Sequence, residues 1–218
     1  MHQWSGQNAE KAQSQSNFDA AKSFFEEHMA IDSEIGDKWG LSYSFLNQGL
    51  VAYYRHDYDS AHMLLQKSLE MMQESNDKSG IANVLFGFGM LSLEQMTTDG
   101  IAKAREHFVT SLNLRRELGE KLQITSGLIG MARHTLYTGN PSLAAKLLGS
   151  VDAVVKPLHI TVEPDLLHFH AQTLAEVREQ LGGSAFQSAW EEGMQWSLEE
   201  AVRLALAGNE DQVSGDGT

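Results

Sequence analysis

Apolar residues along this chain recur with the spacing of one face of an α-helix. In the stretch that starts at Tyr58 they follow the pattern i, i+3, i+4, i+8, i+11, at Ala61, Leu64, Leu65, Leu69 and Met72. Stripes of the same kind occur at Leu41, Phe45, Gly49 and Ala52, at Ala104, Phe108 and Leu112, and at Ala144, Leu147, Leu148 and Val151. Short polar turns such as HDYD (56–59) and TGNPS (138–142) separate the stripes. The pattern therefore predicts a unit made of a helix, a tight turn and a second helix.

This unit is repeated. The stretch that starts at Phe18 aligns without a gap with the stretch that starts at Tyr58, at an offset of 40 residues. A third copy starts at Ile101 and arrives three residues late, because EQMTTDG (94–100) lengthens one turn, and a fourth starts at Pro141. A single helix pair cannot bury its own stripe, so the pairs are expected to stack into an all-α solenoid.

An acidic residue followed by lysine marks the junctions between copies. The segments are IGDKWG (35–40), SNDKSG (75–80) and LGEKLQ (118–123). Gly36, Asn76 and Gly119 suit a left-handed helix C-cap, and the acidic residue that follows each is placed to cap the next helix. We interpret the segments as joints between repeats rather than as a binding motif.

Small residues occur where the two helices of a pair are expected to cross. The pairs are Gly49 with Ala61, Gly89 with Ala104, and Ala132 with Ala144. Glycine inside a helix costs about 1 kcal/mol relative to alanine, so close backbone approach is the expected compensation. Gln48 stands where a large apolar residue is usual, which predicts looser packing of the first complete repeat.

The expected domain organisation has four parts. Residues 1–17 are polar and form a degenerate or truncated leading helix, and residues 18–160 form the repeats. Residues 161–207 form a helical cap, in which Phe186, Trp190 and Met194 share one apolar face and Ser197 with Glu200 fits a capping box. Residues 208–218 are polar and glycine-rich and form a disordered tail.

These features carry a family resemblance. A large apolar residue, Gly or Ala four positions later, a turn and then Ala resemble the tetratricopeptide repeat. The period of about 40 residues and the joints are similar to the longer variant in large bacterial LuxR-type and related STAND ATPase transcriptional regulators. The closing segment of those proteins is similar to residues 144–158 and 181–206. That likeness is carried by Phe186, Ala189, Trp190, Gly193, Ser197, Leu198, Glu200 and Ala201.

The resemblance implies a right-handed superhelical solenoid of antiparallel helix pairs whose first helices line a concave groove. It also implies a non-catalytic interaction or sensor module of a bacterial signal-transduction or transcriptional regulator. The chain contains neither a G-x-x-x-x-G-K-[ST] loop nor a candidate DNA-reading helix-turn-helix, so it would carry neither the ATPase nor the DNA-binding part.

The composition argues against several classes of binding partner and cellular setting. The net charge is −13, with 16 basic and 29 acidic residues, which argues against direct binding of nucleic acid. No apolar run approaches the ~20 residues of a membrane span, and the N-terminus does not have the pattern of a signal peptide. The absence of cysteine excludes disulfides and thiolate chemistry and fits a cytoplasmic protein.

No residue pattern predicts catalysis or a cofactor. Of the nine histidines, His168 and His170 are closest in sequence, but positions i and i+2 of a helix point apart, so we expect surface histidines and no metal site. Adjacent glutamates such as Glu191 and Glu192 diverge in the same way. FGFG (86–89) lies within a helical pattern and is not a dinucleotide fingerprint. We therefore expect no enzyme.

Recognition remains as the expected function. The face opposite the packing stripe of each first helix would point into the groove, and a bound helix or partner domain would contact it. The candidate groove residues are Tyr43, Asn47, Leu50, Tyr54, Asn83, Phe86, Met90, Glu94, Ser126, Ile129, Arg133 and Tyr137. An alternative is that some of them, such as Leu50, Phe86 and Met90, pack only against neighbouring helices.

Two hypotheses of function stay open at this point. The first is the interaction and sensor module of a larger regulator, and the second is a free-standing adaptor that binds a peptide or helix in its groove. A homodimer is also open, because an uncapped first repeat would expose apolar surface.

Overall fold

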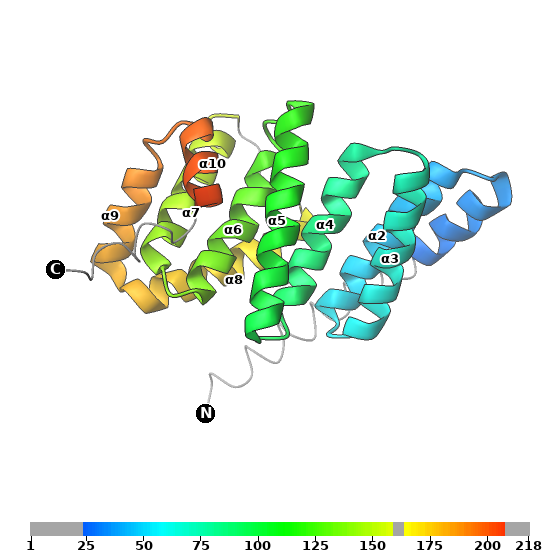
Figure 1. Ribbon diagram of the computed structural model, residues 1–218, viewed down its shortest axis with the longest axis horizontal. Helices are drawn as coiled ribbons and strands as arrows, with labels where there is room; N and C mark the ends of the chain where they lie inside the picture. The colour runs from blue at the N-terminus through cyan, green and yellow to red at the C-terminus, as the bar shows by residue number, and fades with distance from the viewer. Residues whose placement is uncertain (1–23, 159–163, 208–218) are drawn as a thin grey trace. The chain divides into compact units, whose positions relative to one another are not determined.

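A computed structural model describes residues 24–158 and 164–207 (Figure 1). Every regular element in these residues is an α-helix, which confirms the predicted all-α helical-repeat solenoid class. Residues 24–35 are helical and precede α2. The later helices are α2 (Lys38–Tyr54), α3 (Tyr58–Glu74), α4 (Lys78–Leu93), α5 (Thr98–Leu118), α6 (Ile124–Tyr137), α7 (Pro141–Val155), α8 (Pro164–Leu181), α9 (Gly183–Gly193) and α10 (Leu198–Ala207).

Some predictions fall on residues outside this description. They are the leading helix (1–17) and the disordered tail (208–218). The described residues divide into two compact units, one that ends at Leu91 and one that begins at Ser92. This division lies next to the lengthened turn that delays the third copy. The boundary expected between repeats and cap at residue 160 stays a prediction.

The joints between repeats are built largely as their residue types predict. Gly36 (φ 73°), Asn76 (φ 54°) and Gly119 (φ 71°) all adopt the left-handed conformation. Asp37 and Asp77 each accept a hydrogen bond from the backbone N–H three residues on, at 3.0 and 2.9 Å, and so cap α2 and α4.

The third joint departs from this prediction. Glu120 does not cap α6, because α6 begins only at Ile124 and its N-cap residue, Gln123, makes no side-chain cap. The Glu120 carboxylate instead lies 3.9 Å from the guanidinium of Arg115, which is buried at the end of α5. The extra turn at residues 121–123 thus separates this acidic residue from the helix it was expected to cap.

In the unit that ends at Leu91, α2 and α3 pack against each other around Leu65. Leu65 is fully buried in a core cluster with Leu46, Met72, Val84 and Phe88. A methyl group built on Gly49 would lie 3.1 Å from Leu65 atoms, and one built on Gly87 would also lie 3.1 Å from them. Close approach at Gly49 is therefore confirmed, and the nearest side chain there is Leu65, one turn after Ala61, the residue expected from the sequence. The two glycines leave room for one large side chain between neighbouring helices.

In the unit that begins at Ser92, α6 is the central helix. All its residues from Ile124 to Leu136 are buried, and it contacts α5, α7, α8 and α10. Gly127 faces the side chain of Leu112 on α5, where a methyl group would come within 2.8 Å. Apolar residues of α5 and α7, such as Phe108 and Leu147, are fully buried around it.

The C-terminal helices close this unit. α9 lies beside α7 (Figure 1), and its Phe186 and Trp190 are buried as the apolar stripe predicts. The two helices cross at Gly149 and Gly193, where a methyl group would meet the backbone of Trp190 or of Lys146. Ser197 accepts a hydrogen bond from the Glu200 backbone N–H at 3.1 Å, which confirms the forward half of the capping box.

Candidate functional site

The predicted groove residues of α2 lie on one half-buried helix face. Tyr43, Asn47, Leu50 and Tyr54 are all intermediate between buried and exposed. Tyr43 and Leu50 pack against the core cluster around Leu65. Tyr43 also contacts the ring of Trp39, with centroids 4.5 Å apart, and donates a hydrogen bond to Asp77 at 3.2 Å. Tyr43 therefore has a structural role. Asn47 and Tyr54 are the residues of this face that do not pack against the core cluster.

The predicted groove residues of α4 differ in accessibility. Asn83 and Glu94 are half-buried, but Phe86 is only 7% exposed and Met90 only 1%. Neither apolar side chain is open to a partner in this structure. A binding role for these positions stays a prediction, and the burial of Phe86 and Met90 favours the packing alternative for those two.

The predicted groove residues of α6 are covered. Ser126, Ile129 and Arg133 are at most 6% exposed, and Tyr137 is half-buried. Arg133 is covered by α8, which contacts α6 and passes behind it in Figure 1. Arg133 was predicted as the one cation of an open groove. Its side chain is instead enclosed between α6 and α8.

Arg133 is held by groups from both helices. Its guanidinium donates hydrogen bonds to the hydroxyls of Tyr137 at 2.7 Å and Thr173 at 3.2 Å. It also donates to the Glu176 carboxylate at 3.1 Å. The rings of Tyr137 and Phe169 each lie 5.1 Å from it, so the cation contacts two aromatic rings. Burial raises the pKa of the Tyr137 hydroxyl, while Arg133 acts to lower it.

Sequence reasoning missed the α8 contribution to this cluster. Phe169, Thr173 and Glu176 fall within the expected cap (161–207), and the sequence indicates no pairing of this segment with α6. A signal was present, because the residues of α8 that the structure buries recur at helical spacing, at Leu166, Phe169, Thr173 and Val177. That stripe indicates that one face of α8 is covered, but it does not say by which helix.

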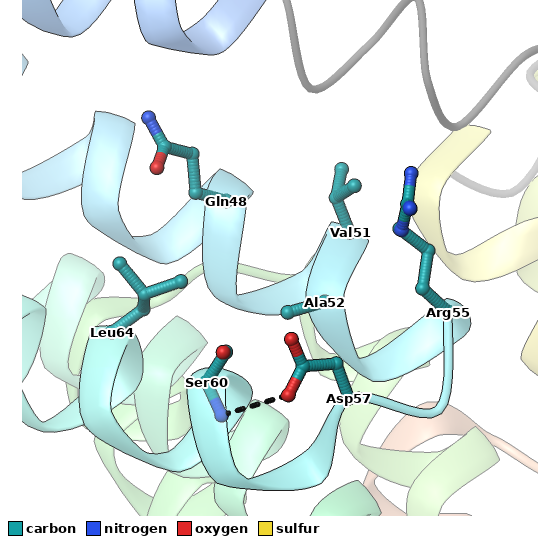
Figure 2. Close-up of a pocket in the computed structure, with 7 residues that line it drawn as sticks. All are labelled: Gln48, Val51, Ala52, Arg55, Asp57, Ser60 and Leu64. Carbon is teal, nitrogen blue, oxygen red and sulfur yellow. Dashed lines mark hydrogen bonds between the residues drawn. The ribbon is translucent and has the colours of Figure 1, made fainter.

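A small pocket of about 140 Å³ lies between α2 and α3 (Figure 2). Its lining is Gln48, Val51, Ala52, Arg55, Asp57, Ser60 and Leu64. Asp57 accepts a hydrogen bond from the Ser60 backbone N–H at 3.2 Å, which caps α3. The Gln48 amide lies 3.6 Å from the sulfur of Met29. The pocket thus occurs where the polar Gln48 predicted looser packing, and its lining contains no paired nucleophile and base.

The histidines differ from the expected surface set. His134 on α6 is 7% exposed, its Nδ1 atom is buried, and no hydrogen bond to that atom is found. Burial, with a smaller contribution from the nearby Arg105 guanidinium, lowers its pKa to about 4. Burial also lowers the pKa of His107 and His170. The expectation of surface histidines was therefore wrong for His134, because α6 is enclosed on all sides.

Within residues 24–158 and 164–207, no group of three His, Asp or Glu side chains is placed to hold a metal ion. His159 lies outside these residues. None of the helices that the structure describes combines the length and the apolar character needed to cross a bilayer.

The fold and these surfaces define a helical-repeat scaffold. The tetratricopeptide repeat family model matches residues 4–74, which include α2 and α3. The match supports the interpretation of the chain as a tetratricopeptide repeat protein. Comparison with curated proteins gave no match, and neither did comparison with solved structures.

Proposed function

We propose that this chain is a non-catalytic interaction and sensor module of a bacterial signal-transduction or transcriptional regulator. The observation that carries the proposal is the tetratricopeptide match to residues 4–74, because such repeats generally mediate protein–protein interaction. The link to a regulator rests on the likeness of residues 144–158 and 181–206 to the closing segment of the regulators. In that role the array binds a partner domain or an inducer and couples the binding to the regulator's activity.

The partner in this proposal is a protein or peptide. The net charge of −13 disfavours phosphate backbones. The α2 face offers an amide at Asn47 and an aromatic ring at Tyr54, seven residues apart on one side of a helix. This mixture suits a helix or peptide that carries both apolar and hydrogen-bonding groups. A scaffold of this fold is typically non-catalytic.

Replacement of Asn47 and Tyr54 by alanine tests the binding face. The wild-type chain, this double variant and a control with Gln66→Ala and Gln73→Ala on the exposed side of α3 would each be used to capture proteins from a lysate. A protein identified with the wild type and the control, but lost with the double variant, supports the proposal. Equal capture by all three at unchanged helical circular dichroism contradicts the assignment of this face.

A free-standing adaptor is the alternative. The coding sequence upstream of Met1 separates the two roles, since an in-frame ATPase supports the regulator and a stop codon supports the adaptor. The homodimer also stays a proposal, which the exposed side chains of Phe24, Ile31, Ile35 and Trp39 support. Sedimentation of the wild type and of an Ile31→Lys, Ile35→Lys variant tests it, because loss of a dimer in the variant is the expected result.

A further inference from the structure

Arg133 is a buried cation that is enclosed by groups from two helices, α6 and α8. Arg133 is 2% exposed, although an ionised side chain is costly to bury without partners. Its partners beyond its own helix all come from α8, at Phe169, Thr173 and Glu176. Arg133 therefore contacts α8 through three side chains spaced i, i+4, i+7.

The fit between the two helices is incomplete in one specific way. Arg133 Nε is buried and has no hydrogen-bond partner. The Glu176 carboxylate contacts only Nη2, at 3.1 Å, and this side chain is 31% exposed. Nε and Nη2 lie on the same edge of a guanidinium, and one carboxylate can engage both in a bidentate pair. The Glu176 carboxylate of α8 thus engages only one of these two nitrogens, whereas a better-placed carboxylate would engage both.

We propose that the α6 surface around Arg133 is a docking site for an acidic helix of another protein, and that α8 is its intramolecular occupant. The partner helix carries an aromatic residue, a small hydroxyl residue four positions later and a carboxylate three positions after that. It binds by displacing α8. The inference rests on the proposed interaction function and names the partner's chemistry and the means of regulation.

The contacts that α8 makes with Arg133 indicate which side chains the partner helix carries. The aromatic ring stacks on the guanidinium, as Phe169 does, and the carboxylate occupies the Nε and Nη2 edge. Because α8 belongs to the same chain, it competes with a free helix at a high effective concentration. A free helix therefore binds the intact chain weakly, and it binds more strongly once the contacts of α8 are weakened.

The probe for the test is a labelled peptide of residues 164–181, PDLLHFHAQTLAEVREQL. Fluorescence anisotropy would measure its binding to the full-length wild-type chain and to a chain with Phe169→Ala and Glu176→Gln. The weakened chain is expected to bind the peptide at least about tenfold more tightly than the wild type. Addition of Arg133→Gln to the weakened chain is expected to remove that gain.

A matched pair of peptides tests the role of the carboxylate. Glu179 lies on the exposed side of α8, one turn after Glu176. The Glu176→Gln peptide should bind about tenfold more weakly than the wild-type peptide, whereas the Glu179→Gln peptide should bind equally well. Equal binding of all three peptides would overturn the proposal.

Hydrogen exchange of the wild-type chain gives a readout that does not depend on variants that fold poorly. Excess unlabelled peptide should accelerate amide exchange in α8 while α5 and α7 stay protected. Unchanged protection of α8 at saturating peptide places the peptide elsewhere and overturns the proposal. A dimer in which two copies exchange α8 would overturn the choice of another protein as partner. Lysate capture through Asn47 and Tyr54 can succeed or fail independently of these results.

Discussion

The hydroxyl of Tyr43 donates a hydrogen bond to the Asp77 carboxylate at 3.2 Å, across 34 positions of sequence. The same carboxylate caps α4 by accepting from the Gly80 N–H at 2.9 Å. The Asp77 side chain thus caps the N-terminus of α4 and also links α4 to α2 through Tyr43. The equivalent joint residue Asp37 caps α2 through Gly40, at 3.0 Å.

We predict that Asp77→Ala destabilises the protein by more than Asp37→Ala. Loss of either cap costs about 1 kcal/mol. Asp77→Ala also removes the bond to Tyr43, which contributes about 0.5–1.5 kcal/mol. Urea unfolding of both variants, of Tyr43→Phe and of the double variant gives a thermodynamic cycle. A coupling energy of zero between Tyr43 and Asp77 would show that the hydrogen bond adds nothing.

The left-handed joints predict opposite effects for two substitutions. Gly119→Ala should cost about 1–2 kcal/mol, because alanine disfavours φ 71° and no neighbouring atom lies within 4 Å of the new methyl group. Asn76→Gly should leave the free energy of unfolding unchanged or raise it. Asn76 already adopts φ 54°, and glycine adopts this positive φ without the steric cost of a side chain. Thermal denaturation checks both. A stable Gly119→Ala variant would contradict the backbone explanation.

The crossing of α7 and α9 predicts strong intolerance of a single methyl group. Gly193→Ala places it against the Lys146 carbonyl, which is backbone and cannot rotate away. We expect a loss of about 3 kcal/mol or more in the free energy of unfolding. Gly183→Ala on the same helix is the control, because nothing lies within 4 Å of its methyl group. Equal stability of the two variants would mean that the helices are further apart than described.

Burial of His134 predicts a loss of stability in acid. Its folded pKa of about 4 is below the ordinary value of 6.5, so the unfolded chain binds the proton more readily. The loss of folding stability caused by His134 is therefore absent above pH 6.5. It grows as the pH falls towards 4, where it reaches about 3 kcal/mol. His107 and His170 shift in the same direction.

The variant His134→Leu isolates this contribution. The wild type should lose more stability than His134→Leu between pH 7 and pH 4.5, as measured by urea unfolding at each pH. The difference between pH 7 and pH 8.5 should be the same for both proteins, because His134 is neutral throughout that range. Parallel curves down to pH 4.5 would show that this side chain is not buried.

Much of the local structure could be predicted from the sequence. The helical spacing of apolar residues, the polar turns and the residues at Gly36, Asn76 and Asp77 act on neighbours within about four positions, and the structure has them as expected. The joint at Glu120 was mispredicted. The same residue types are present there, but an extra turn shifts the start of α6 to Ile124.

The candidate site could be predicted only in part. Helical spacing correctly grouped Tyr43, Asn47, Leu50 and Tyr54 on one face of α2. It could not show that Tyr43 is committed to Asp77, because the hydrogen bond joins two different repeats. Spacing also says nothing about accessibility, which is why Phe86 and Met90 were expected in an open groove and are buried.

The sequence by itself determined the repeating helix pair, its frame and its joints, because those depend on periodicity and on capping by near neighbours. Only the tertiary structure decided that α8 covers α6. The contact of Arg133 with Glu176 joins residues 43 positions apart, and no local pattern specifies which exposed face a later helix will cover. That contact turns an expected groove cation into an enclosed one. The remaining surroundings of α6 come from α5, α7 and α10, which also belong to other parts of the sequence.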